Sequence, residues 1–413
     1  MFHFAGISNV GRTHVRIMMA FGRELERRGH RFTMFQSRFV EELVTRAGIS
    51  FFPLPDDDNQ FAGLMQRMSG HAGVSFRTYP EYMRLSSRLL CRRGPEAFSA
   101  SAVDFVLVDQ EEPGGATAAE IAGIPFVTIC SSLPLNQEAG IPPGFLPWQY
   151  RPEWWAKLRN RAAYKVRDFV IRPVFKEINR ERRIHRLAPY SQPEDSFSRL
   201  AQISQLIPEF DLPRKSLPPR FSYVGPFLRQ AEGPATPFPF DRLDGRPLIY
   251  VYYGGASAVK KTVIHQIAAA CTSLDAQLVV ALGEAGATMD LPGSPIVVDF
   301  APQLQLLKMA KLVISHGGFS TTMEALGAGV PLLVIPFNGD QPGVGARVTH
   351  TGVGVSLPLA SCNADALRSA IVRLLSSPEY RDRAGLMRQR ITRTGGIGAA
   401  ADLIEDCAGL PRA

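Results

Sequence analysis

The chain has 413 residues, a formal net charge of +8 and 45% hydrophobic residues, which suggests two or three soluble domains. Its five cysteines are scattered without a CxxC pair, which argues against a disulfide scaffold or a cysteine metal site and for a reducing compartment. No run of about 18 apolar residues would span a membrane, and glycine and arginine interrupt the apolar core that a signal peptide needs. We therefore expect a cytoplasmic protein.

Strands and helices alternate in the first half of the chain. Strands are expected at residues 2–7, 31–36, 103–108 and 126–130. A turn at residues 8–11 leads from the first strand into a helix with helical spacing of apolar residues, which ends at Gly29. The third strand leads directly to Asp109. Alternating strands and helices indicate a parallel sheet, and the carboxyl ends of its strands carry the functional loops.

A second alternating region follows a segment that is rich in proline and glycine. Residues 227–247 lack an apolar pattern and predict a linker between two domains. Beyond the linker, strands are expected at 248–253, 277–282 and 295–300, and a helix is expected at 261–274. The sequence therefore predicts two similar α/β halves.

The positive charge is concentrated between Arg151 and Arg186, where twelve Lys or Arg residues stand against four Asp or Glu residues. Aromatic residues are interleaved with these charges: Trp148, Trp154, Trp155, Tyr164 and Phe169. The segment has three interpretations: a solvated helix face with its aromatics packed inward, peripheral contact with the anionic inner face of a membrane, or contact with nucleic acid. We expect one of the first two and no nucleic-acid partner.

Residues 299–347 carry the most informative pattern. An apolar strand leads into His316 and a pair of glycines, and a helix follows through Glu324. A second apolar strand then leads to Asp340 and Gln341. A helix N-terminus after paired glycines presents free backbone N–H groups and the positive end of the helix dipole, which suits a phosphate. The polar side chains around it suit the hydroxyls of a ribose and a sugar.

This stretch resembles the nucleotide-sugar signature of the family 1 glycosyltransferases, the UDP-glycosyltransferases. The matching positions are Pro302-Gln303, His316, Gly318, Glu324, Gly329-Val330-Pro331, Pro336 and Asp340-Gln341. About ten matches in register over roughly fifty residues form a specific signal, unlike a lone glycine motif. The resemblance implies the GT-B architecture, an α/β fold in which two doubly wound Rossmann-like domains face each other across a cleft.

The resemblance also predicts the limits of the domains. Residues 1–226 would form the acceptor-binding domain, 227–247 the linker and 248–398 the domain that binds the nucleotide sugar. In this fold the last helix often crosses back onto the first domain, and residues 399–408 are expected to do so.

The family assigns an expected role to each position that would bind the donor. His316, the helix that starts at Gly318 and the Thr321 hydroxyl would bind the diphosphate, whose negative charge grows as the glycosidic bond breaks. Glu324 would accept hydrogen bonds from the ribose, and Gln303 would bind the edge of the uracil.

The remaining donor positions include two departures from the family. Asp340 and Gln341 would hold the hydroxyls of the sugar, which is most often glucose. Phe300 stands where the family has the tryptophan that stacks on uracil, and Ser320 stands where it has an asparagine. These departures leave UDP and TDP open. The family works without a metal, so we expect no metal and no cofactor, with UDP-glucose as a donor substrate.

Glycosyl transfer needs a base that takes the proton of the attacking hydroxyl. His14 follows the first turn, at the position of the family's catalytic histidine, and Asp109 matches the aspartate that orients it. Direct attack by the activated hydroxyl would invert the anomeric centre and give a β-glucoside.

The prediction of the acceptor rests on the first half of the chain. Residues 107–142 and 201–226 resemble bacterial zeaxanthin glucosyltransferases, which implies a hydroxylated carotenoid as acceptor. Other hydroxylated lipids, sterols, polyketides and phenolics remain open. A second alternative is a non-catalytic protein that binds a nucleotide or a lipid. Such a protein would not need His14 with Asp109. A nicotinamide oxidoreductase is disfavoured because the first turn, GISNVG, lacks the GxGxxG pattern, and no P-loop is present.

Overall fold

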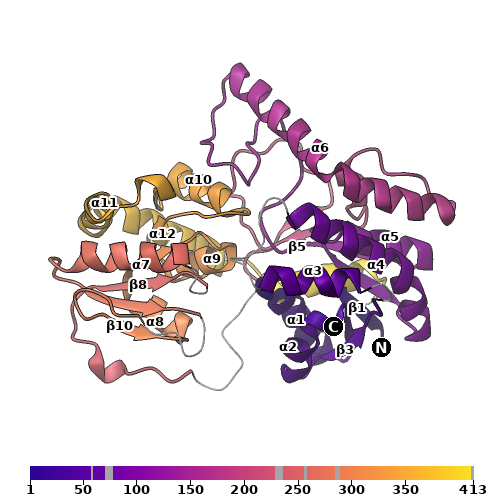
Figure 1. Ribbon diagram of the computed structural model, residues 1–413, viewed down its shortest axis with the longest axis horizontal. Helices are drawn as coiled ribbons and strands as arrows, with labels where there is room; N and C mark the ends of the chain where they lie inside the picture. Colours follow the sequence, from indigo (N-terminus) through magenta and orange to yellow (C-terminus); the bar gives the residue numbers. More distant parts are fainter. Residues whose placement is uncertain (57–58, 70–77, 228–235, 255–257, 284–288, 411–413) are drawn as a thin grey trace.

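The computed structural model describes residues 1–56, 59–69, 78–227, 236–254, 258–283 and 289–410. Within these ranges the chain forms a seven-stranded and a six-stranded sheet. The strand pairings in both sheets are parallel. Figure 1 shows the two sheets on opposite sides of the molecule, each with its own helices. The expected α/β class, with two Rossmann-like domains, is confirmed.

The first sheet has the strand order β3-β2-β1-β4-β5-β6-β7. Its strands are β1 (His3–Ile7), β2 (Arg31–Gln36), β3 (Ser50–Pro53), β4 (Phe105–Asp109), β5 (Phe126–Cys130), β6 (Gln202–Ser204) and β7 (Phe221–Tyr223). Every residue of β1, β4 and β5 is buried, because helices cover both faces of the sheet. These helices are α1 (Arg12–Arg27) and α2 (Glu41–Arg46) on one face, and α4 (Thr78–Ala100) and α5 (Pro113–Ala122) on the other, with α3 (Gln60–Ser69) beside α4.

The second sheet has the strand order β10-β9-β8-β11-β12-β13. Its strands are β8 (Leu248–Tyr252), β9 (Gln277–Ala281), β10 (Ile296–Val298), β11 (Ala310–Ser315), β12 (Leu332–Val334) and β13 (Gly354–Ser356). One face packs on α7 (Ala258–Cys271) and α11 (Ala364–Ser376). The other face packs on α8 (Gln303–Met309), α9 (Phe319–Ala328), α10 (Gln341–Thr351) and α12 (Pro378–Thr392).

The last helix, α13 (Gly396–Cys407), lies against α1 of the first sheet and shares its apolar core. Arg28 joins the two helices, because its Nη1 lies 2.6 Å from carboxylate oxygens of both Asp402 and Glu405. Figure 1 shows that the chain also begins in this half of the molecule. We keep the limits 1–226 and 248–398 as a proposal, since residues 228–235 of the predicted linker lie outside the described ranges.

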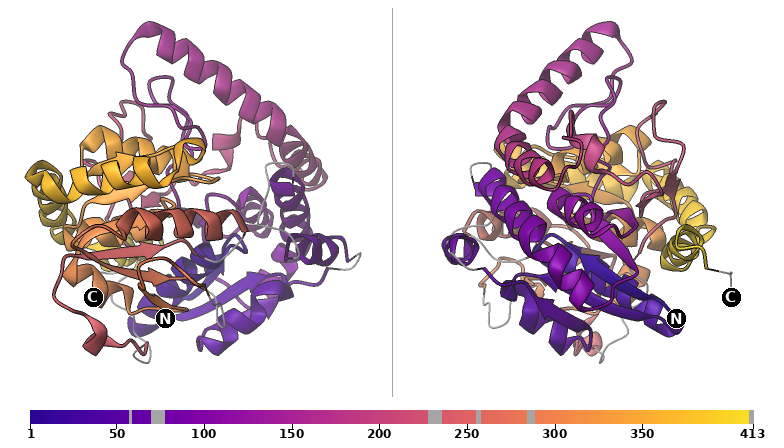
Figure 2. Two further views of the ribbon diagram at one scale, coloured as in Figure 1. Left: turned by 60° about the vertical axis from the view of Figure 1, so that its left-hand side comes forward. Right: turned by 90° about the vertical axis from the view of Figure 1, so that its right-hand side faces the viewer.

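The basic segment forms one long helix, α6 (Trp154–Ile184), of 31 residues. Figures 1 and 2 show it running along the outside of the molecule, where one end stands clear of both sheets. Its buried side, which includes Asn160, Tyr164, Val174 and Ile178, faces the rest of the first half, and α6 packs on α4 and α5. The opposite side of the helix faces solvent.

Candidate functional site

The carboxyl ends of β1 and β4 bring His14 and Asp109 together. The two strands are parallel neighbours in which Ile7 pairs with Val108, so the first turn of α1 lies beside the last residue of β4. His14 Nδ1 lies 2.7 Å from Asp109 Oδ2. The Ser131 hydroxyl donates to the same carboxylate oxygen at 2.8 Å and lies 2.8 Å from His14 Nδ1. Because a carboxylate only accepts, Nδ1 carries a proton and Nε2 is the ring nitrogen that can take another.

Three carboxylates surround this histidine. Burial lowers the pKa of His14, but Asp109 and Glu111 outweigh it, with help from Asp340, and raise that pKa to about 10. Glu111 lies on the open side of the ring, with its Oε1 3.8 Å from Nε2. Asp109 is 1% exposed and the His14 side chain 18%, so solvent or a substrate can reach only one side of the pair.

Asp340 reaches this cluster from the other sheet. It precedes α10, and its Oδ2 accepts a hydrogen bond of 3.3 Å from the backbone N–H of Leu133 in the first half. Burial, together with the negative charge of Glu111, raises the pKa of Asp340 to about 6. A predicted sugar-binding residue of the second half therefore lies beside the predicted base of the first.

His316 stands at the N-terminus of α9, as the signature predicts. Gly317 has a left-handed φ of 83°, which favours glycine. A Cβ on Gly318 would lie 2.7 Å from His316 Nε2, so Gly318 makes room for the ring. Burial lowers the pKa of His316 to about 4, and Lys260 adds to the effect. The imidazole is therefore neutral, and it can donate one hydrogen bond.

Two buried polar atoms at the start of α9 lack a partner. Among the described residues, neither His316 Nδ1 nor Ser320 Oγ has a hydrogen-bond partner, and Thr321 is buried beside them in the first turn. The first backbone N–H groups of a helix also have no partner within it. This combination fits an anion such as a diphosphate, whose oxygens would accept from these groups.

Gln303 and Glu324 form a second polar group beside α9. The Gln303 amide nitrogen donates to the Glu324 carboxylate, and Tyr250 donates to the Gln303 oxygen at 3.1 Å. Burial raises the pKa of Glu324, which also borders a cavity of about 510 Å³ between α8, α9 and α12. Phe300 is 47% exposed, so its ring is available for stacking.

The polar atoms of the Gln341 side chain are already hydrogen-bonded within the turn that precedes α10. Its oxygen accepts hydrogen bonds from the backbone N–H groups of Phe337 and Asn338 at 2.9 and 3.1 Å, and its nitrogen donates to the Asn338 side chain. Contact between this residue and a sugar would replace some of these bonds.

Sequence reasoning did not assign a role to Glu111 or Ser131. The structure places the Ser131 hydroxyl in contact with both His14 and Asp109. Glu111 stands two residues beyond a strand that ends in Asp109, and a polar residue directly beyond a buried parallel strand is the signal that could have identified it.

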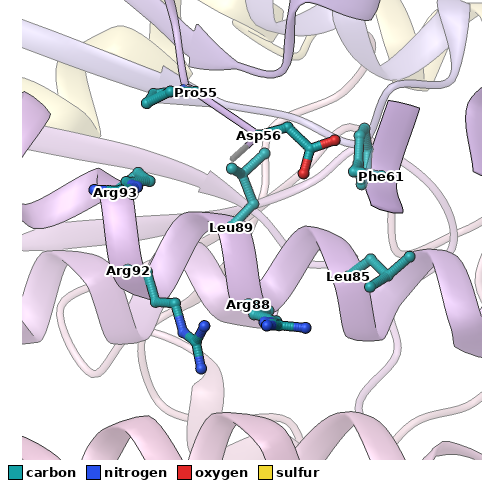
Figure 3. A pocket seen from close by; sticks show the side chains of 8 residues that line it. All are labelled: Pro55, Asp56, Phe61, Leu85, Arg88, Leu89, Arg92 and Arg93. Atoms are coloured by element: carbon teal, nitrogen blue, oxygen red, sulfur yellow. The ribbon is translucent and has the colours of Figure 1, made fainter. Parts of the chain in front are cut away.

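A separate cavity of about 130 Å³ lies between α4 and the start of α3. Figure 3 shows the side chains that line it: Pro55, Asp56, Phe61, Leu85, Arg88, Leu89, Arg92 and Arg93. Arg92 points away from Asp56 in this view, and its Nε pairs with Glu181 of α6 at 2.8 Å. The cavity includes none of the predicted site residues.

Among the described residues, no group of three or more His, Cys, Asp or Glu side chains is placed to hold a metal ion. No helix in the described ranges has the length and apolar character needed to cross a membrane.

Known proteins resemble this chain over its whole length. A family model described as "Erythromycin biosynthesis protein CIII-like, C-terminal domain" matches residues 265–394. A protein of Pantoea ananas, described as a zeaxanthin glucosyltransferase, is 34% identical, with 100% of this chain and 97% of that protein aligned. A protein of Pseudescherichia vulneris with the same description is 31% identical over 98% of each. The solved structure of the glycotransferase of kitacinnamycin matches with a TM-score of 0.75 at 23% identity, over 99% of each chain.

Proposed function

The chain belongs to the family 1 glycosyltransferases of the GT-B fold, and from this premise we propose that it transfers glucose, with inversion, from UDP-glucose to a hydroxyl of an apolar acceptor. The observation that carries this proposal is the pair His14–Asp109, joined at 2.7 Å beside Asp340 of the opposite sheet. A protein that only bound a nucleotide or a lipid would not need this pair.

The geometry supports a single displacement. Asp109 holds Nδ1, so Nε2 would take the proton of the acceptor hydroxyl as its oxygen bonds to the anomeric carbon. The bond from that carbon to the diphosphate would break, and UDP would leave with the electron pair. The start of α9, with His316 and Ser320, would stabilise the charge that gathers on the diphosphate.

We propose a hydroxylated carotenoid such as zeaxanthin as the acceptor. Support comes from the two full-length relatives described as zeaxanthin glucosyltransferases, because the match includes the half that would bind the acceptor. Other lipids, sterols, polyketides or phenolics, and TDP-sugars as donors, are the alternatives.

Mass spectrometry of the products tests the substrates. The protein is incubated with UDP-glucose or TDP-glucose and with zeaxanthin, a sterol or a flavonoid. We expect glucosides of zeaxanthin from UDP-glucose, with β configuration by NMR. Transfer only to the sterol or the flavonoid would contradict the acceptor, and an α-linked product would contradict inversion.

We further propose that α6 brings the protein to an anionic membrane surface, where such an acceptor resides. Along α6, which the structure describes in full, every exposed ionisable side chain is cationic: Lys157, Arg161, Lys165, Arg172, Lys176, Arg180 and Arg183. The same side of the helix exposes large apolar residues: Trp154, Trp155, Leu158, Val166, Phe169 and Ile184.

The acidic residues of α6 face the protein instead. Glu181 pairs with Arg92 of α4 at 2.8 Å, and Glu177 lies 3.9 Å from Arg88. Asp168 accepts a hydrogen bond of 3.1 Å from the Gln137 side chain, outside α6, and lies 2.8 Å from Arg167 of the same helix. This separation leaves a face that combines cations with aromatic rings, which suits a layer of anionic headgroups above acyl chains.

Vesicle sedimentation tests the membrane proposal. We expect salt-sensitive binding to phosphatidylglycerol vesicles and little binding to phosphatidylcholine vesicles. Each cation near such a surface contributes about 1 kcal/mol, so changing Lys165, Arg172 and Lys176 to Gln should weaken binding roughly a hundredfold. The control variant removes the same number of positive charges from another helix, by changing Arg381, Arg383 and Arg388 of α12 to Gln. Equal losses in the two variants, or binding that ignores salt, would contradict a specific role for α6.

A further inference from the structure

Glu111 is a carboxylate that the proposed mechanism does not use, although it lies at the reacting side of His14. Its Oε1 is 3.8 Å from His14 Nε2, the nitrogen that Asp109 leaves open. That separation is too long for a hydrogen bond but short enough for strong electrostatic attraction. Asp109 and Glu111 therefore lie at the two nitrogens of one imidazole ring.

The position of Glu111 is fixed by its own hydrogen bonds. Tyr79 of α4 donates to Oε2 at 2.7 Å, and Ser132 donates to Oε1 at 2.8 Å. Asn9, in the turn before α1, donates to Oε2 at 3.5 Å. The side chain is 15% exposed, so little water screens its charge from the ring. Three donors from three segments hold the carboxylate beside Nε2.

We propose that Glu111 is a positioning residue that sets the proton affinity of His14 Nε2, and thereby the pH range in which transfer occurs. The inference rests on the proposed role of His14 as the base. In the reaction the hydroxyl proton passes to Nε2, the hydroxyl oxygen bonds to the anomeric carbon, and UDP leaves with the electron pair. Glu111 takes part in none of the bonds that form or break, but its negative charge stabilises the imidazolium that forms on His14.

The other charged groups around His14 would not compensate for the loss of the Glu111 charge. Asp109 of β4 faces Nδ1, and Asp340 beside α10 contributes a weaker interaction than Glu111 does. The cations of α1 near the cleft, Arg12 and Arg16, act on Tyr252 of β8. Loss of the Glu111 charge should therefore lower the proton affinity of His14, and the ring should become neutral at lower pH.

NMR titration of the histidine ring C–H signals in the full chain tests this inference without any substrate. The His14 signal is assigned as the one missing in His14→Gln. An opposite charge within about 4–6 Å shifts a pKa by roughly 1–3 units, so Glu111→Gln should move the His14 midpoint to lower pH by at least about one unit. Glu96→Gln, on the exposed side of α4, is the matched control and should leave the midpoint unchanged.

Glucosyl transfer by the same variants gives a second readout. The acid limb of kcat/KM should move to lower pH in Glu111→Gln, while the maximal rate falls because the base is weaker. Glu111→Asp keeps the negative charge but moves it away from the ring, so the His14 midpoint should lie between those of the unmodified protein and Glu111→Gln. This variant provides the test if Glu111→Gln does not fold. An unchanged His14 titration in these variants would overturn the inference. A shifted titration with an unmoved acid limb would instead contradict His14 as the base.

Discussion

The two histidines of the proposed site have opposite electrostatic surroundings. Carboxylates around His14 outweigh its burial and raise its pKa to about 10, whereas burial, together with the positive charge of Lys260, lowers the pKa of His316 to about 4. His14 therefore has a high affinity for a second proton, as a base requires. His316 stays neutral and can offer one N–H to an anion without holding it as tightly as a full charge would.

The raised pKa of His14 predicts the pH dependence of transfer. A base must be neutral before it accepts a proton, and a histidine whose pKa is raised becomes neutral only at higher pH. We therefore expect kcat/KM to rise from neutral pH toward about pH 10. A rate profile in buffers of constant ionic strength measures this. A plateau that begins below pH 7 would show that the carboxylates do not act on the base as described.

Ser131→Ala should slow transfer without weakening donor binding. The hydroxyl contacts both His14 Nδ1 and Asp109 Oδ2 at 2.8 Å, so its loss leaves the ring less well oriented. A hydrogen bond to a charged group contributes about 1.5 kcal/mol, which corresponds to roughly a tenfold fall in kcat. Steady-state kinetics at saturating acceptor measure the effect. A change confined to the KM for UDP-glucose would place Ser131 in donor binding instead.

At the scale of the secondary-structure element, the start of α9, which we propose as the diphosphate site, has a shape that depends on glycine. Gly317 adopts a left-handed φ of 83°, and Gly318 leaves the space that the His316 ring fills. The helix then presents its free N–H groups beside Ser320 Oγ, which has no partner among the described residues. Ordering this turn before the donor arrives reduces the entropic cost of binding.

Gly318→Ala should weaken donor binding. The new Cβ would lie 2.7 Å from His316 Nε2 and would push the ring off the helix start. Gly327→Ala, on the same helix, is the matched control, since its Cβ would meet only Ile391 Cγ2 at 3.7 Å. Calorimetry with UDP should show roughly a tenfold or greater loss for the first variant and little change for the second. Equal affinities of the two variants for UDP would show that the position of the His316 ring does not affect donor binding.

The elements also show which features a sequence can predict. Strands at 31–36 and 126–130 are confirmed, because their runs of apolar residues are bounded by clear turns. The strands β6 and β13 were missed, since three residues such as Gln202–Ser204 are too short for a pattern. Pairing with neighbours that are distant in the sequence creates these strands.

The same limit applies to the site. The family resemblance pointed to His14 and Asp109, and their contact could be predicted because one follows β1, the other ends β4, and the ends of adjacent parallel strands meet. The contact of Glu111 with Tyr79 and Asn9 depends on how α4 packs against two loops, which no local pattern encodes. The direction of the cations on α6 likewise depends on Arg88 and Arg92 of another helix, which pair with its acids.

At the scale of the whole molecule, α10 links the two sheets. Arg347 of α10 is buried, and its Nη2 lies 2.6 Å from Asp211 in the loop after β6. Arg214 and Tyr223 hold the other oxygen of Asp211, at 3.0 and 2.8 Å. The backbone N–H of Gly343 also donates to the first half, to the carbonyl of Gly144 at 2.8 Å. These contacts hold the start of α10, with Asp340, against the first half.

Arg347→Met should therefore destabilise the protein strongly. Removing one partner of a buried ion pair costs about 3–5 kcal/mol, and we expect the lower end of this range because Arg214 still pairs with Asp211. The control is Arg46→Met, which removes the exposed pair of Arg46 with Glu42 and should cost no more than about 1 kcal/mol. Urea denaturation of the two variants measures the difference in free energy of unfolding. Equal stabilities would show that the contact between the sheets contributes little.

The role of His14 as the base is tested most directly in the variant His14→Ala, by measuring both glucosyl transfer and UDP binding. The substitution removes Nε2 but leaves the start of α9, where the donor would bind, untouched. We predict that mass spectrometry detects no glucoside above the level of uncatalysed transfer, while calorimetry finds unchanged affinity for UDP. Turnover close to that of the unmodified protein, with UDP still bound, would contradict the role of His14 as the base.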